Sequence, residues 1–237
     1  MKHLPNFITV LNLCCGCAAI VAIFNSQVQQ AGIFILSAMA LDFLDGTVAR
    51  VLKAWSELGK QLDSLADMVS FGLVPGLILY TLFLKGNAVS SFHTPFTAAG
   101  AWYMFTVTVF SALRLAKFNI DKRQSTYFIG LPTPANTLLI LSMAFIVEYN
   151  ELGLGNWILN PWFLIGFVTI SSALLVAEIP LISLKVNLSD LKSNTPALLL
   201  VSASIVLFIL FRFAAPPLII ILYLILSHVF PPNKKHI

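Results

Sequence analysis

Four aspartates lie close together in an otherwise apolar part of the chain. Asp42 and Asp45 are three residues apart, and Asp63 and Asp67 are four apart. On a helix, residues with these spacings share one face, so two helices joined by a short loop would turn both pairs toward each other. A carboxylate at the centre of a membrane helix costs roughly 2.5–3.5 kcal/mol on insertion scales, so such acids usually line a cavity or bind a cation. The spacing therefore predicts a shared cationic ligand.

Oxygen-rich ligand sets favour hard cations. Mg²⁺ and Mn²⁺ prefer carboxylates and water, and they often share their coordination shell with substrate phosphates. The chain has only three cysteines and four histidines, and none clusters with the aspartates in sequence. We therefore expect Asp42, Asp45, Asp63 and Asp67 to bind divalent metal, either Mg²⁺ or Mn²⁺.

The residues between the two aspartate pairs suit a ligand that carries phosphate. Gly46 and Ala49 leave room beside the carboxylates, and Arg50 offers a permanently charged fork for phosphate oxygens. Gly59 lies one turn before the second pair on the same face, where it would open space for a nucleotide. Ser56, in the connecting loop, adds a hydroxyl group. The segment thus predicts a nucleotide or phosphate site next to the metal.

The acidic cluster has two other interpretations. In the first, the aspartates merely pair with Arg50, Lys53 and Lys60 at the membrane surface. Ordinary surface pairing does not account for the shared face, the small residues and the arginine together. In the second, the chain is a cation transporter, which can also hold acids in the membrane. A transporter has no need of the Gly, Ala and Arg arranged between the acids.

The elements that position these residues must be membrane helices. The chain is 58% hydrophobic and 10% charged, against roughly 45–50% and about 25% in soluble domains. We expect an all-α integral membrane protein that forms a single domain over residues 1–237, with the catalytic motif at 42–67. With about 20 apolar residues needed per crossing, about eight transmembrane helices are predicted, roughly at 7–25, 31–53, 61–84, 96–117, 132–149, 158–184, 196–213 and 215–230.

The basic residues predict the orientation of this bundle. Of the 14 Lys and Arg residues, all except Lys85 and Arg212 fall in loops or ends on one side of the predicted topology. Because cytoplasmic loops are enriched in Lys and Arg, we expect both termini and the aspartate motif on the cytoplasmic side of a multi-pass cell-membrane protein. The pI near 9.0 then reflects this orientation and attraction to anionic membrane lipids, and no nucleic-acid partner is expected.

The aspartate segment resembles the signature of a known family. The pattern D-x2-D-G-x2-A-R-x8-G-x3-D-x3-D is met at every fixed position, by Asp42, Asp45, Gly46, Ala49, Arg50, Gly59, Asp63 and Asp67, and it looks like that of the CDP-alcohol phosphatidyltransferases. The resemblance implies an all-helical bundle, usually a homodimer, that moves a phosphatidyl group from a CDP-activated lipid to a small alcohol in a cavity open to the cytoplasm. It also implies that the first three aspartates bind metal, while Asp67 binds metal and acts as the base.

Sequence similarity elsewhere in the first 140 residues indicates one acceptor. Residues 62–76 and 111–136 resemble membrane-embedded phosphatidylserine synthases, which implies that the substrates are CDP-diacylglycerol and L-serine. Arg114 and Lys117 share a face and precede Asn119, so they could hold the carboxylate of an amino acid or the lipid phosphate. At Lys117 the family more often has Arg, which weakens the case for a bidentate contact. Glycerol 3-phosphate or inositol phosphate is the alternative acceptor, although either would call for more anion-binding residues here.

Each of two further polar features has two alternative roles. Asn6, Thr9 and Asn12 lie about one turn apart on the first span, where they either contact the cytidine or its phosphates or simply cap the helix. Glu178, late in the sixth span and followed by Pro180, is the remaining unexpected acid. The sequence leaves it as either a wet helix end or a substrate contact.

Overall fold

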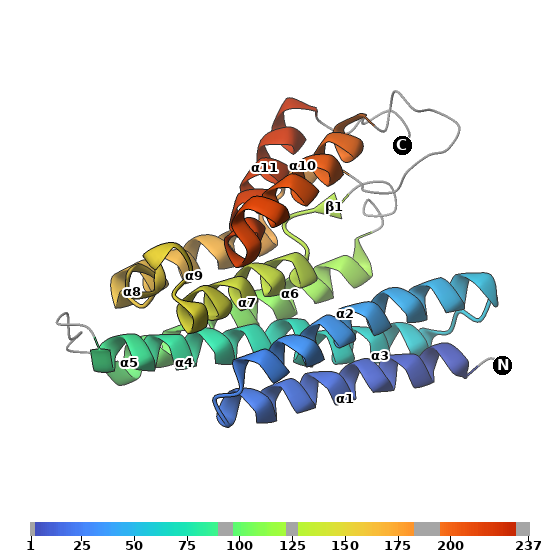
Figure 1. Ribbon diagram of the computed structural model, residues 1–237. Helices are drawn as coiled ribbons and strands as arrows, with labels where there is room; N and C mark the ends of the chain where they lie inside the picture. The colour runs from blue at the N-terminus through green and yellow to red at the C-terminus, as the bar shows by residue number, and fades with distance from the viewer. Residues whose placement is uncertain (1–2, 90–96, 122–127, 183–194, 231–237) are drawn as a thin grey trace.

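The computed structural model describes residues 3–89, 97–121, 128–182 and 195–230, and these are almost entirely helical (Figure 1). A helix occupies each of the eight ranges predicted as spans, which confirms the all-α expectation. The α-helices are α1 (Leu4–Phe24), α2 (Val28–Val51), α3 (Glu57–Asp67), α4 (Val74–Val89), α5 (Thr97–Tyr103), α6 (Thr106–Ile120), α7 (Thr133–Tyr149), α8 (Gly155–Ile158), α9 (Pro161–Val176), α10 (Thr195–Phe211) and α11 (Ala215–Val229).

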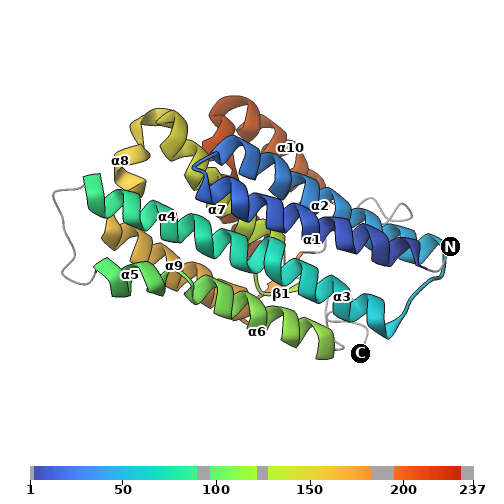
Figure 2. The same cartoon turned by 90° about the horizontal axis from the view of Figure 1, so that it is seen from below.

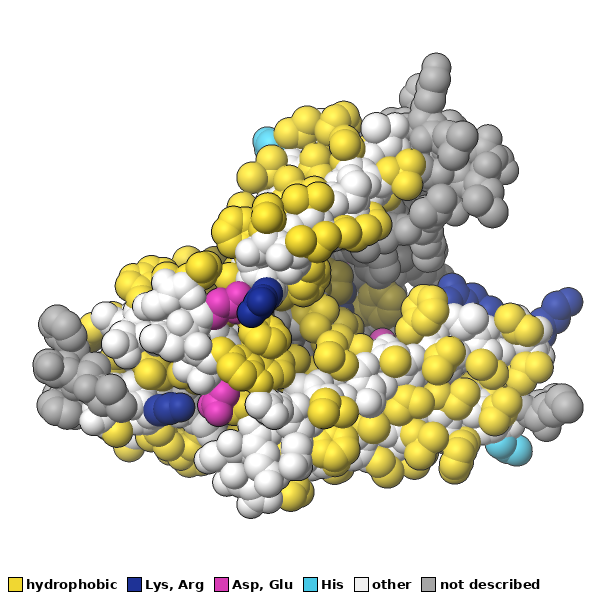
Figure 3. All heavy atoms as spheres, viewed as in Figure 1, with side chains coloured by type: hydrophobic (Ala, Val, Ile, Leu, Met, Phe, Trp, Pro, Cys, Tyr) yellow, Lys and Arg dark blue, Asp and Glu magenta, His cyan; other side chains and the backbone are white. Residues whose placement is uncertain are grey.

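The helices are long and apolar enough for a multi-pass membrane protein. Within the described ranges, four helical stretches meet the length and hydropathy of a membrane crossing: Leu4–Phe24, Val28–Val51, Glu57–Ala88 and Thr195–Val229. The apolar helices α7 and α9 are shorter. Large hydrophobic side chains are exposed along the four membrane-length stretches, as at Ile209 of α10, which is 74% exposed. Figure 3 shows apolar side chains over much of the face in view, with a few charged side chains between them, and such an apolar surface is suited to lipid.

Three predicted spans differ in detail from the helices observed. The fourth is split, because α5 ends at Tyr103 and α6 begins at Thr106. The sixth ends at Val176 and not near residue 184. There the chain becomes extended, and the two-residue strand β2 (Pro180–Leu181) pairs antiparallel with β1 (Phe128–Ile129). Pro180 lacks the N–H that a continuing helix needs, whereas hydropathy stays high through Ile182 and extended the prediction too far.

The third span contains a π-helical segment, η1 (Met68–Leu73), between α3 and α4. Its wider turn leaves backbone carbonyls free for partners from neighbouring helices. Thr108 of α6 donates its hydroxyl to the Gly72 carbonyl at 2.8 Å, and Thr137 of α7 donates to the Phe71 carbonyl at 3.2 Å. The segment directly follows Asp67, so these two bonds fix the helix next to the acidic cluster.

The helices form one layered bundle with α10 and α11 leaning away from it. Figure 2 shows α1, the α3–α4 rod and α6 running side by side, and contacts join α1 to α2, α3 and η1. The main core is apolar and includes the fully buried Phe71, Leu79 and Phe83. The start of α1, the end of α2, the start of α3 and the end of α6 all lie at the end of the bundle where the N-terminus is labelled in Figure 1.

Candidate active site

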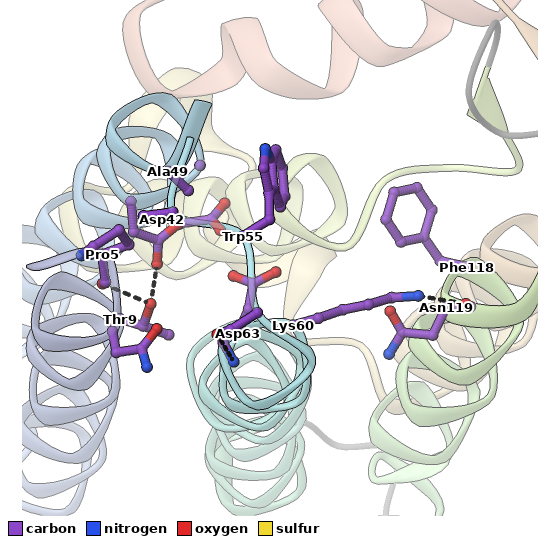
Figure 4. A pocket seen from close by; sticks show the side chains of 15 residues that line it. Pro5, Thr9, Asp42, Ala49, Trp55, Lys60, Asp63, Phe118 and Asn119 are labelled. Atoms are coloured by element: carbon purple, nitrogen blue, oxygen red, sulfur yellow. Dashed lines mark hydrogen bonds between the residues drawn. The ribbon is translucent and has the colours of Figure 1, made fainter. Parts of the chain in front are cut away.

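A cavity of about 280 Å³ opens where these four helix ends meet. Most residues predicted from the aspartate segment and the N-terminal helix line it. Its lining comprises Pro5, Asn6, Thr9, Asp42, Asp45, Gly46, Ala49, Ala54, Trp55, Ser56, Gly59, Lys60, Asp63, Phe118 and Asn119. In Figure 4, Thr9 of α1, Asp63 of α3 and Asn119 of α6 stand around the cavity. We call it the aspartate cavity.

Three of the four aspartates converge on one point. One carboxylate oxygen from each of Asp42, Asp63 and Asp67 lies within 4.8 Å of the other two. Oδ1 of Asp63 is buried and has no hydrogen-bond partner. Like charges this close repel unless a cation offsets them, and an all-oxygen donor set suits a hard divalent ion. The chemistry of these residues therefore fits the predicted metal.

The helix α1 holds the other oxygens of the acidic cluster. Thr9 donates its hydroxyl to Oδ2 of Asp45 at 2.6 Å, so Asp45 lines the same cavity but lies outside the three-carboxylate group. Asn12 is fully buried and donates from Nδ2 to Oδ1 of Asp67 at 3.3 Å. Ser70 in turn donates its hydroxyl to Oδ1 of Asn12 at 2.8 Å. Asn12 thus orients Asp67. Its side chain contacts Asp67 and Ser70 and does not line the aspartate cavity, where a nucleotide contact was expected.

The small residues of the segment have distinct surroundings. A Cβ atom added at Gly46 would meet nothing within 4 Å, so this side of α2 faces open cavity. At Gly59 a Cβ would lie 2.8 Å from Oδ1 of Asn6, which shows that α3 approaches α1 closely there. Ser56 begins α3, and its hydroxyl accepts a hydrogen bond from the Gly59 N–H at 3.0 Å. These residues shape the cavity wall beside the aspartates.

Arg50 lies differently from the sequence prediction. Its Nε donates to the Gly46 carbonyl at 3.1 Å and its Nη2 to the hydroxyl of Thr47 at 3.3 Å. The guanidinium therefore folds back on its own helix, and it is not among the residues that line the aspartate cavity.

Five lining residues escaped the sequence analysis as site residues: Pro5, Ala54, Trp55, Lys60 and Phe118. Lys60 reaches across the cavity and donates from Nζ to the Asn119 carbonyl at 2.7 Å (Figure 4). Asn119 donates from Nδ2 to the Ser64 hydroxyl at 2.7 Å, so α3 and α6 are joined at this wall. The position of Trp55 between the two aspartate pairs was the one signal available, since a loop bridging a catalytic motif usually contacts the ligand.

The predicted acceptor residues are divided between two cavities. Asn119 lines the aspartate cavity, whereas Arg114 and Lys117 line a second one of about 320 Å³ together with Glu178. Arg114 is buried, and the end of α6 joins the two regions because Lys117 and Phe118 are consecutive residues that line one cavity each. Lys122 and Arg123, which the sequence assigned to topology, lie outside the described residues.

Comparisons with known proteins place this chain in a family. A sequence model of the family described as CDP-alcohol phosphatidyltransferase matches residues 2–181. A relative from Bacillus subtilis is 35% identical over 156 residues, which are 66% of this chain and 83% of that protein. One from Mycobacterium tuberculosis is 36% identical over 189 residues, 76% of this chain and 61% of its own length. One from Saccharomyces cerevisiae is 37% identical over 163 residues, 62% of this chain and 55% of its own.

All three relatives carry the name CDP-diacylglycerol–serine O-phosphatidyltransferase. The chain spans less than two thirds of the mycobacterial and yeast proteins but most of the Bacillus one. The family match covers the aspartate segment and every residue that lines either cavity. By this match and by the converging carboxylates, the chain belongs to the CDP-alcohol phosphatidyltransferase family.

Proposed function

We propose that this protein transfers the phosphatidyl group of CDP-diacylglycerol to the hydroxyl of L-serine, giving phosphatidylserine and CMP. The observation that carries the transferase chemistry is the convergence of Asp42, Asp63 and Asp67 beside the aspartate cavity. The choice of serine is supported by the names of the relatives.

The aspartates would hold Mg²⁺ or Mn²⁺ through Asp42, Asp63 and Asp67, with Asp45 completing the predicted set after a change in its bond to Thr9. When bound, such ions would offset the negative charge of the lipid diphosphate. We propose that the rest of the CDP-lipid site consists of Asn6, Thr9, Gly46, Ala49, Arg50, Ser56 and Gly59. Arg50 would reach a phosphate by leaving the Gly46 carbonyl that it now contacts.

Asp67 would act as the base. Its carboxylate takes the proton of the serine hydroxyl while the serine oxygen attacks the phosphorus that bears diacylglycerol. The bond between that phosphorus and the oxygen of the CMP phosphate breaks, and CMP leaves with that oxygen. Asn12 keeps the Asp67 carboxylate in position. Arg114 and Lys117 would bind the serine carboxylate from the second cavity, and Asn119 would contact the acceptor from the aspartate cavity.

The membrane arrangement and the assembly stay predictions. We propose a single domain with both termini and the aspartate cavity on the cytoplasmic side. The placement of Lys53, Lys60 and Lys117 at the helix ends around the site supports this, since cytoplasmic ends are enriched in Lys and Arg. A homodimer in contact with membrane lipids is expected from the family resemblance.

The test is CMP release by purified protein in detergent with CDP-diacylglycerol and either Mn²⁺ or Mg²⁺. L-serine, glycerol 3-phosphate and inositol phosphate are compared as acceptors. We expect release that depends on serine. Release only with another acceptor would retain the family and discard serine, and cation flux in liposomes without CDP-lipid would favour a transporter.

The role of Asp67 is tested separately with Asp67→Asn, which has almost the same shape and cannot accept the serine proton. We expect turnover to be abolished, while binding of CDP-diacylglycerol falls much less. Turnover equal to that of the wild type would refute the assignment of the base.

A further inference from the structure

The cavity beside α6 and α9 has an unusual balance of charge for a site that binds an anionic acceptor. It measures about 320 Å³ and is lined by two basic residues, Arg114 and Lys117, and by two acids, Asp121 and Glu178. We call it the α6–α9 cavity. A phosphate-bearing acceptor would meet the Glu178 carboxylate, and like charges at close range disfavour binding. A zwitterion, with one group of each sign, matches the two basic side chains and Glu178 better.

Arg114 is the side chain suited to bind the anionic group of such a zwitterion. Its side chain is only 7% exposed, and its Nε is buried with no hydrogen-bond partner. A buried donor without a partner forfeits the hydrogen bonds it made to water, and the ring of its neighbour Phe118, 6.0 Å from the guanidinium carbon, accepts no conventional hydrogen bond. The free N–H therefore points to a ligand anion. The end of α6 lines both cavities, because Phe118 and Asn119 border the aspartate cavity, so this anion would lie next to the acidic cluster.

Glu178 lies across the cavity on a segment that its backbone holds in place. Before it, the Leu131 N–H donates to the Leu174 carbonyl at 2.9 Å. After it, the Gly130 N–H donates to the Ile179 carbonyl at 3.0 Å. Gly130 has φ +73°, and a Cβ there would lie 2.7 Å from the Leu175 carbonyl and 2.9 Å from that of Ala177. Only glycine permits this close approach, which fixes the backbone on both sides of Glu178.

We propose that Glu178 binds the ammonium group of the acceptor amino acid while Arg114 and Lys117 bind its carboxylate. This rests on the proposed function and adds a residue that selects the acceptor. The serine hydroxyl would then extend toward the aspartates, since Lys117 of this cavity and Phe118 of the aspartate cavity are consecutive residues of α6. Glu178 lines the cavity and is exposed to solvent, so a small amino acid can reach it without rearrangement of the bundle.

The test compares two acceptors that differ only at the group Glu178 would bind. L-Serine carries an ammonium group, whereas L-glycerate keeps the hydroxymethyl and carboxylate groups and has a hydroxyl in its place. In Glu178→Gln we expect the KM for L-serine to rise about 10- to 100-fold, the range for losing a charged hydrogen bond. We expect kcat, and kcat/KM for L-glycerate, to stay within about threefold. Glu178→Asp, which keeps the charge, should recover part of the serine affinity.

Glu148→Gln is the matched control, because Glu148 is an exposed acid that lines a different cavity with Lys85. Its KM for L-serine should equal that of the wild type. An unchanged serine KM in a folded, active Glu178→Gln protein would overturn the ammonium contact alone. A wild-type protein that releases no CMP with serine would overturn the proposed function and this inference together, so the two failures are distinguishable.

Discussion

Gly46→Ala separates the role of the cavity in binding from its role in folding. In the structure a Cβ at this position meets nothing within 4 Å, so the added methyl group fits the protein without strain. Alanine also favours a helix interior over glycine by about 1 kcal/mol in soluble hosts. We therefore expect the unfolding temperature of the variant in detergent to equal or exceed that of the wild type.

Binding should change in the opposite direction. If CDP-diacylglycerol places a phosphate beside Gly46, the methyl group occupies space that the ligand needs, and overpacking of this kind costs about 1–3 kcal/mol. That free energy corresponds to a roughly 5- to 150-fold weaker interaction. We expect the KM for CDP-diacylglycerol, measured by CMP release at saturating serine, to rise within this range.

Gly166→Ala is the matched control, since Gly166 also lies inside a helix, α9, and its Cβ also meets nothing within 4 Å. It lines an apolar cavity remote from the aspartates, so its KM for the CDP-lipid should not change. A wild-type KM in Gly46→Ala would refute the placement of the lipid phosphates beside Gly46.

Three further predictions follow from single contacts. Thr9→Val keeps the side-chain shape but removes the 2.6 Å hydrogen bond to Asp45. The free energy of unfolding should therefore fall by about 1.5–3 kcal/mol. An unchanged melting temperature would contradict this prediction. Gly16→Ala would bring a Cβ against the Ser70 hydroxyl and 3.1 Å from the Ser70 Cα, so we expect destabilisation by about 1–3 kcal/mol in the same thermal assay, where wild-type stability would show that α1 can move. Chelation with EDTA should abolish CMP release, and added Mn²⁺ or Mg²⁺ should restore it. The same metal should raise the melting temperature of the wild type but not that of Asp63→Asn. Full activity in EDTA would refute the metal site.

The spans and the acidic cluster were predictable because local rules govern them. A run of apolar residues must form a helix in lipid, where the backbone has no other hydrogen-bond partner, so hydropathy alone located a helix in each of the eight predicted ranges. Spacings of three and four place residues on one helix face, and the small loop between the pairs forces two helices together. Asp42, Asp63 and Asp67 therefore meet as expected from sequence.

The remaining features depend on contacts between helices, which spacing does not reveal. The sequence placed Asn6, Thr9 and Asn12 about one turn apart on the first span, but only the packing of α1 against its neighbours decides that Asn12 contacts Asp67. Arg50 was expected at a phosphate, yet in the protein by itself the nearest acceptor is a carbonyl one turn back on its own helix. The early end of α9 escaped hydropathy because Ile179 and Leu181 are as apolar in a strand as in a helix.

The π-helical turn after Asp67 also limits how this chain can vary over evolution. An α-helix advances by about 100° per residue, so removing one residue from Met68–Leu73 to restore a regular helix would swing the whole of α4 around its axis relative to the aspartates. The apolar face that α4 turns to the core would then point elsewhere, and Thr108 and Thr137 would lose their carbonyl partners. Exchanges of side chains in this segment can be absorbed one at a time, whereas a change in its length shifts the catalytic end and the core out of register at once.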